Sequence, residues 1–185
     1  MNLLQECFRR AQHGSDISDH LPRLFELAST PYVKVIELGV RRGDSTSAFL
    51  AAAQEQGGEV WSVDITPPVV PVEWQGLPFW YPIVGDDLQV SDQLPDDVDI
   101  VFIDTSHTYE QTKAELELYV KKVKPGGFMV LHDTELQRPA ASPESDPDFP
   151  VAHAIRMFFC DENKDLWTRI EWVEGCYGLG IITVR

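Results

Sequence analysis

Short apolar runs rich in valine and isoleucine recur along the chain. They cover residues 33–38, 60–64, 79–84, 98–104, 127–132, 166–173 and 179–184. After the first and the fourth run, in residues 45–56 and 108–123, apolar side chains recur at helical spacing instead. Strands that alternate with helices pair in parallel through right-handed crossovers. The pattern therefore predicts an α/β fold with helices on both faces of one sheet.

The beginning of the chain departs from this alternation. Residues 3–12 and 18–28 read as two amphipathic helices that can cap one side of the sheet. A length of 185 residues suits one domain. We therefore predict a single domain over residues 1–185, in which residues 1–30 form an N-terminal helical cap.

Composition narrows the range of partners. Thirty acidic residues against 15 Lys and Arg give a net charge of −15, so the surface repels phosphate backbones and a nucleic-acid partner is not expected. The same charge would not deter a small neutral ligand or a divalent cation, and it equally suits a simple role in solubility. No apolar run approaches the roughly 20 residues of a membrane span, and no signal peptide is visible, so a cytoplasmic location without a membrane partner is expected.

The turn after the first strand has the composition of a ligand-binding loop. Ligands of open parallel sheets bind outside the carboxyl ends of the strands. Here Glu37 is followed by Gly39 and Gly43, which permit a tight turn, and by Ser45, which can cap the next helix. The spacing matches neither the dinucleotide-binding fingerprint nor a P-loop. Glu37 would repel a pyrophosphate and favour a cationic amino acid or a sulfonium group, although an ordinary strand-to-helix turn has similar glycines.

Acidic residues also end the second and third strands. Asp64 suits the two hydroxyls of a ribose, and Asp86 or Asp87 suits an adenine amine, although each alone is equally explained as a solvated loop residue. Four nearby aromatic residues are expected in the core or stacked on a ligand: Trp74, Phe79, Trp80 and Tyr81.

Five segments together resemble the class I S-adenosylmethionine-dependent methyltransferases. They are VIELGVRRGDS, VWSVDI, PIVGDD, VDIVFIDTSHTYEQ and VKPGGFMVLHD, and the resemblance runs from about residue 33 to residue 185. It implies a Rossmann-like, seven-stranded sheet that is mostly parallel, with an antiparallel last strand from the hairpin of residues 166–173 and 179–184. It also implies S-adenosylmethionine as cofactor. The residues expected at the cofactor are Glu37, Gly39, Gly43, Ser45, Asp64, Asp86, Asp87 and Asp104.

The fourth and fifth strands are neighbours in that fold, and both end in acids. Asp104 and Asp133 should face one another across the cofactor's methyl group, with His107 one short loop away. Two carboxylates about 4 Å apart repel by roughly 4 kcal/mol at an effective dielectric constant of 20, so a proton or a metal ion must neutralise them. Oxygen ligands in an acidic site favour Mg²⁺.

The same residues resemble a metal-dependent O-methyltransferase subgroup that includes macrolide-sugar and cephalosporin-biosynthesis enzymes. The resemblance implies that Asp104 and Asp133 hold Mg²⁺ and that His107 acts as the general base. His132 stands where some members have glutamate, so it either ligates a softer metal, hydrogen-bonds a metal-bound water, or packs. The alternative for His107 is a loop histidine that caps the helix of residues 108–123.

We therefore predict a Mg²⁺-dependent O-methyltransferase that modifies a hydroxyl of a small molecule, such as a sugar or a glycosylated natural product. The alternatives are a catalytically silent cofactor-binding protein or subunit, and an N- or C-methyltransferase without metal. The proline-rich segment 137–150 follows the predicted metal site and is expected to be a lid over the acceptor or a flexible loop. A partner subunit that completes the acceptor pocket would make a homo-oligomer, and this is left open.

Overall fold

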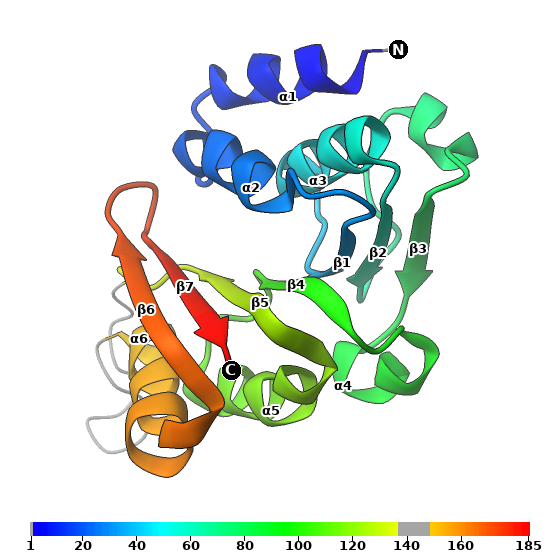
Figure 1. Cartoon of the computed structure of the whole chain (residues 1–185). Helices are drawn as coiled ribbons and strands as arrows, with labels where there is room; N and C mark the ends of the chain where they lie inside the picture. The colour runs from blue at the N-terminus through cyan, green and yellow to red at the C-terminus, as the bar shows by residue number, and fades with distance from the viewer. Residues whose placement is uncertain (1, 137–148) are drawn as a thin grey trace.

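Seven strands form one mixed sheet in the order β3-β2-β1-β4-β5-β7-β6 (Figure 1). The computed structural model describes residues 2–136 and 149–185. The strands are β1 (Lys34–Leu38), β2 (Glu59–Asp64), β3 (Trp80–Val84), β4 (Val98–Ile103), β5 (Val123–His132), β6 (Trp167–Val173) and β7 (Leu179–Val184). Strands β1 to β5 pair in parallel, and β7 runs antiparallel between β5 and β6. The predicted sheet, with its antiparallel last strand, is confirmed.

Helices cover both faces of this sheet, as predicted (Figure 1). The group α1 (Leu3–Ala11), α2 (Leu21–Ala28) and α3 (Asp44–Gln56) covers one face, and α5 (Tyr109–Tyr119) and α6 (Pro150–Ile155) cover the other. The short helix α4 (Asp87–Val90) lies beside α5. Alternation along the strands explains this division. In β4, Ile100 and Phe102 pack with the α1–α3 layer, whereas Val101 and Ile103 pack with the α5–α6 layer.

The N-terminal cap differs from the prediction in the boundary of its second helix. The predicted helix 18–28 is a 3₁₀ turn, Ser18–His20, followed by α2, whose first turn contains Pro22. α1 and α2 both pack on α3, as expected of a helical cap. α3 itself is almost entirely buried, because it lies between that cap and the sheet. Whether the chain is a single domain stays a prediction.

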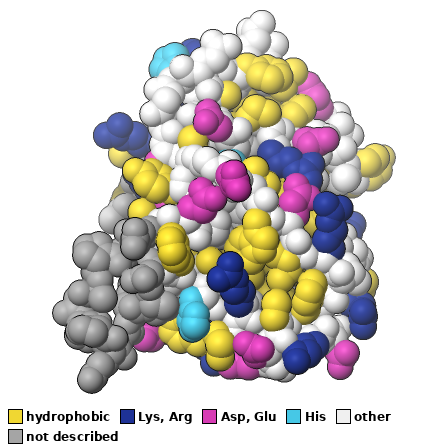
Figure 2. Space-filling model, turned by 90° about the vertical axis from the view of Figure 1, so that its left-hand side faces the viewer, with side chains coloured by type: hydrophobic (Ala, Val, Ile, Leu, Met, Phe, Trp, Pro, Cys, Tyr) yellow, Lys and Arg dark blue, Asp and Glu magenta, His cyan; other side chains and the backbone are white. Residues whose placement is uncertain are grey.

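Strand β6 forms one edge of the sheet, on the side that Figure 2 shows. Hydrophobic side chains gather in the middle of this side, with acidic and basic side chains among and around them (Figure 2). Arg169 and Glu171 pair on β6, and the guanidinium of Arg156 lies over the ring of Trp172. Charged side chains discourage pairing of an exposed edge with another strand. Within the described ranges, no helix has both the length and the apolar character that a membrane span requires.

Candidate active site

A cavity of about 400 Å³ opens at the carboxyl ends of the central strands. Its size is typical of small-ligand sites. The residues that follow β1 to β4 all contribute to its wall, together with α5. They include Gly39, Arg41, Asp64, Asp86, Asp87, Asp104 and Gln111. Five of the residues predicted at the cofactor therefore share one cavity: Gly39, Asp64, Asp86, Asp87 and Asp104.

The two glycines of the first turn are required for packing. Gly39 has a φ of +90°, and a Cβ atom there would collide with the backbone carbonyl oxygen of Asp104. The ends of β1 and β4 can approach only because this side chain is absent. At Gly43, with a φ of +76°, a Cβ atom would lie 2.8 Å from both Trp74 and Val70. Gly43 therefore fits against the core, and Trp74 is a fully buried core residue.

Glu37 lies beneath the cavity and not in its wall. Its carboxylate is fully buried and accepts hydrogen bonds from the hydroxyls of Ser45, Thr46 and Ser62, at 2.6 to 2.9 Å. Burial raises the pKa of this carboxyl to about 7, although the three hydroxyls oppose the shift. Glu37 thus ties β1 to β2 and α3. A direct cofactor contact by Glu37, Gly43 or Ser45 stays a prediction, since none of them lines the main cavity.

Asp64 fixes the loop that follows β1. Its Oδ2 accepts the backbone N–H groups of Val40 and Arg41, both at 2.9 Å, and its Oδ1 accepts from the backbone and the hydroxyl of Thr66. Burial raises the pKa of Asp64, but the hydrogen bonds from Arg41, Thr66 and Val40 outweigh it and hold the pKa below its ordinary value. The carboxylate is therefore ionised and held at the cavity wall, ready to accept further hydrogen bonds.

A second acidic group lies where α4 and α5 meet the cavity. Asp86 caps α4 by accepting the backbone N–H of Leu88. The side-chain amide of Gln111 donates to both Asp87 and Glu115, at 3.0 and 2.9 Å. Burial raises the pKa of Asp87, and it raises that of Glu115 to about 8. Because Gln111 gives both amide hydrogens to these acids, its amide oxygen is left as an acceptor at the cavity.

Asp104, His107 and Asp133 converge at one point, as the sequence predicts. Nε2 of His107 lies 3.1 Å from Oδ1 of Asp104 and 2.9 Å from Oδ2 of Asp133. Burial raises the pKa of both carboxyls, but their contacts with His107 and His132 outweigh burial and hold both pKa values below their ordinary range. Burial would lower the pKa of His107, and the two carboxylates instead raise it to about 9.

His132 belongs to the same cluster. Its Nε2 lies 2.7 Å from the carbonyl oxygen of Cys176, which can only accept, so Nε2 carries a hydrogen. Nδ1 then faces the acids, 3.2 Å from Oδ2 of Asp133 and 3.5 Å from Oδ1 of Asp104. Within the described part of the chain, this buried Nδ1 has no hydrogen-bond partner. The two carboxylates outweigh the effect of burial and raise the pKa of His132 to about 10.

The loops that hold this cluster are strained. His107 and Asp133 have φ values of 57° and 60°, in the left-handed region that few residues other than glycine adopt. The N-cap of α5 is Thr108, whose hydroxyl accepts the backbone N–H of Gln111. His107 lies in the loop but does not cap the helix, so the capping role that the sequence left open for it is wrong.

The donor set suits a divalent cation. One ligand atom from each of Asp104, His107 and Asp133 lies within 4.8 Å of the others. Nδ1 of His132 faces the same acids at ion-pair distance without an aligned hydrogen bond among the described residues, and its Nε2–H is anchored by a backbone carbonyl, as is usual for histidine ligands. If only the two carboxylates coordinate the ion, their oxygen atoms suit Mg²⁺. If one or two imidazole nitrogens also coordinate it, a softer ion such as Mn²⁺ is suited.

The chain belongs to the methyltransferase domain family, whose model matches residues 36–134. The matched segment contains the end of β1, all of β2 to β5, and the cluster of Asp104, His107 and Asp133. This membership confirms the predicted class, an S-adenosylmethionine-dependent methyltransferase. Among curated proteins, none matches the sequence.

Several solved structures share the fold at low sequence identity. The cofactor-bound Rv0187 from MTB is 19% identical with a TM-score of 0.75, and the match covers 99% of this chain and 89% of that one. The SAH-bound Podospora anserina methyltransferase PaMTH1 is 12% identical with a TM-score of 0.68, covering 100% and 88%. MycE of the mycinamycin biosynthetic pathway, in complex with Mg and SAH, is 16% identical with a TM-score of 0.66. That match covers 91% of this chain and 49% of MycE, so the chain spans about half of MycE.

The sequence did not reveal several residues that line the cavity, two polar side chains among them, or one contact in the histidine cluster. Arg41 and Gln111 line the cavity, and the Cys176 carbonyl fixes His132. The position of Arg41 between Gly39 and Gly43, in the predicted ligand-binding turn, was the signal that could have identified it. Gln111 lies in the first turn of α5. Its contact with Asp87 depends on where α4 packs against α5, and the sequence does not show that packing. A backbone carbonyl leaves no signal in the sequence.

Proposed function

We propose that this protein is a divalent-cation-dependent O-methyltransferase that acts on a hydroxyl of a small molecule, with a sugar or a glycosylated natural product as the acceptor class. The observation that carries the proposal is the convergence of Asp104 and Asp133 on Nε2 of His107. Buried paired acids beside a base suit deprotonation of a hydroxyl at a cation. The MycE structures with Mg and SAH, one of them also with mycinamycin VI, support this direction by likeness of fold.

The cavity accommodates S-adenosylmethionine along the strand ends. Asp64 would accept from the ribose hydroxyls, and Asp86, Asp87 and the amide oxygen of Gln111 would face the adenine. The sulfonium would then lie near Asp104, where S-adenosylmethionine supplies an electrophilic methyl group. The negative wall favours this cationic donor over its neutral product.

The chain's own groups then carry the proton. Asp104 and Asp133 would hold Mg²⁺, with His132 as a further ligand or as support for the acids. The bound cation would supply positive charge that lowers the pKa of the acceptor hydroxyl. With Asp104 and Asp133 holding a cation, their hold on His107 would weaken and its pKa would fall from about 9 toward the ordinary value, so that Nε2 would first release its proton to solvent and could then accept the hydroxyl proton. General-base help of this kind contributes about 10² to 10⁴ in rate.

Binding of Mn²⁺, followed by electron paramagnetic resonance, tests the metal site without knowledge of the acceptor. Asp133→Asn should weaken Mn²⁺ binding at least about tenfold, because it removes a charged ligand from a buried site. Asp92→Asn is the matched control, because Asp92 is exposed and does not line the cavity. Equal Mn²⁺ affinity in the wild type and in Asp133→Asn would refute the metal site.

Methyl transfer from labelled S-adenosylmethionine to a panel of hydroxylated glycosides tests the reaction. Turnover should disappear with EDTA, return with Mg²⁺, and fall by at least about 100-fold in His107→Ala. Turnover that persists in EDTA would instead favour a metal-independent methyltransferase. The cytoplasmic location, the absence of a nucleic-acid partner and the oligomeric state stay predictions.

A further inference from the structure

An ion pair between Arg41 and Asp16 lies at the edge of the main cavity, next to the glycine turn. A guanidinium nitrogen of Arg41 donates to Oδ2 of Asp16 at 2.8 Å. Beside this pair is a recess of about 30 Å³ between the N-terminal segment and the glycine turn. Arg41 and Asp104 line both this recess and the main cavity. The ion pair therefore separates the two spaces.

The backbone of Arg41 is fixed from both sides. Its N–H donates to Asp64, its carbonyl accepts the N–H of Val69 at 2.9 Å, and its φ is 49°. This conformation costs about 1 to 2 kcal/mol for a residue with a side chain. Asp64 thus holds Arg41 in a conformation that it would not adopt alone, and the guanidinium stays next to the cavity.

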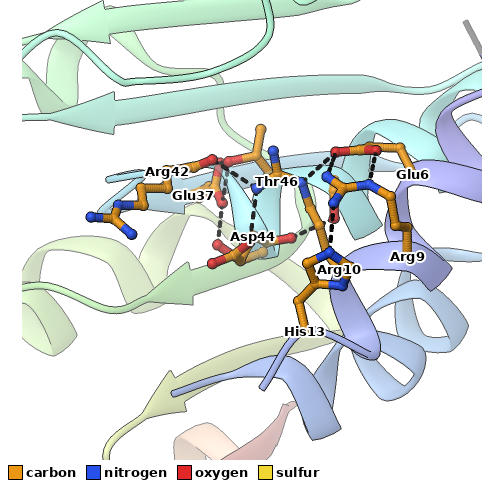
Figure 3. Close-up of polar contacts among 10 residues, drawn as sticks. Glu6, Arg9, Arg10, His13, Glu37, Arg42, Asp44 and Thr46 are labelled. Atoms are coloured by element: carbon orange, nitrogen blue, oxygen red, sulfur yellow. Dashed lines mark hydrogen bonds and ion pairs between the residues drawn. The ribbon is translucent and has the colours of Figure 1, made fainter. Parts of the chain in front are cut away.

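The N-terminal segment that carries Asp16 is also anchored to the glycine turn. Arg10 of α1 donates to the carbonyl of Arg42 and to the carboxylate of Asp44, at 2.8 and 2.7 Å (Figure 3). Arg10 is held in turn by Glu6 at 2.8 Å (Figure 3). Asp16 lies in the turn that follows α1, so the anchored helix holds the segment that presents Asp16 to Arg41.

The charges along the cavity wall indicate which group of the cofactor would contact Arg41. The cavity wall carries the acids Asp64, Asp86, Asp87 and Asp104, and among the described residues of that wall Arg41 is the only basic one. A ligand carboxylate is repelled everywhere else along the wall, whereas an ammonium group is attracted by Asp16. The amino-acid end of the cofactor carries one group of each sign.

We propose that Arg41 and Asp16 form the subsite for the amino-acid end of the cofactor, with the ligand carboxylate on Arg41 and the ligand ammonium on Asp16. The internal ion pair opens and is exchanged for two ion pairs with the ligand. The helical cap then contributes directly to cofactor binding. This inference rests on the cofactor of the proposed function but not on its metal or its acceptor.

Calorimetry in EDTA with three ligands tests the subsite. S-Adenosylhomocysteine carries both charged groups, decarboxylated S-adenosylmethionine lacks the carboxylate, and 5′-methylthioadenosine lacks the whole amino-acid end. Arg41→Gln should weaken S-adenosylhomocysteine about 10- to 100-fold and leave the other two within about twofold. Asp16→Asn should weaken both ligands that carry an ammonium and spare 5′-methylthioadenosine. Arg169→Gln, which removes an exposed paired arginine on β6, should change none of them.

The pattern across ligands separates this subsite from a general loss of structure. Unchanged 5′-methylthioadenosine binding shows that a variant is folded with an intact nucleoside site. Equal weakening of all three ligands by Arg41→Gln, or no weakening of S-adenosylhomocysteine, would overturn the subsite. A wild type that binds none of the three would overturn both the subsite and the proposed function. Failure to observe metal-dependent turnover, with binding of the three ligands as expected, would overturn the proposed function and leave the subsite intact.

Discussion

The buried carboxyl of Glu37 predicts a specific dependence of stability on pH. Burial raises its pKa from 4.5 to about 7, so the folded protein binds this proton more tightly than the unfolded chain does. The free energy of unfolding contributed by Glu37 therefore falls as the pH rises from 4.5 to 7 and stays low above that range. At about 1.4 kcal/mol per pKa unit, the whole loss is about 3 kcal/mol.

Urea unfolding followed by tryptophan fluorescence, from about pH 5 to about pH 8, measures this effect. Glu37→Gln keeps the shape of the side chain but cannot ionise, and the hydroxyls of Ser45, Thr46 and Ser62 can rotate to suit an amide. Relative to the wild type, Glu37→Gln should gain about 3 kcal/mol in unfolding free energy across this range. Contributions from other acids cancel in this difference.

Glu55→Gln is the matched control, because Glu55 lies exposed on the same helix, α3. It should keep the pH dependence of the wild type. If the unfolding free energies of Glu37→Gln and the wild type run parallel over the whole range, the reasoning that burial holds this proton is refuted.

Two further substitutions test the turn and the helix that flank the cavity. Gly39→Ala should lower the unfolding free energy by at least about 3 kcal/mol, because the new methyl group meets the carbonyl of Asp104 in addition to the strain of a positive φ. Gly126→Ala, also at positive φ but in open space, should lose only about 1 kcal/mol in the same urea measurement, and equal losses would exclude the collision. Thr108→Ala should cost about 1 kcal/mol through loss of the cap on Gln111, and an unchanged urea midpoint would contradict that role.

The parts of the site that the sequence predicts are those at strand ends. Parallel strands bring their carboxyl ends to one edge, so a terminal acid is placed by the strand alone. For this reason Asp104 shares the cavity with Asp64 and also meets Asp133 at His107, which follows Asp104 by a short loop.

The parts that it does not predict depend on which strands and loops become neighbours. Ser62 lies opposite Glu37 in the register of β1 and β2 and donates a hydrogen bond to it. The carboxylate that was expected to contact the cofactor therefore makes a buried hydrogen bond within the protein. β5 begins at Val123, before the predicted start at 127, because an irregularity in its pairing with β4 accommodates Pro125. The expectation of a lid at residues 137–150 concerns a segment that lies, except for its last two residues, outside the described part of the chain.

The position of β7 affects when the cluster of His132, Asp104 and Asp133 can form in the nascent chain. β7 inserts between β5 and β6, although both precede it in the sequence. Until residues 179–184 have left the ribosome, β5 offers an unpaired edge, and the turn whose Cys176 carbonyl orients His132 cannot dock. A chaperone that shields the β5 edge during synthesis would therefore protect the strand that ends at His132, directly before the proposed metal ligand Asp133.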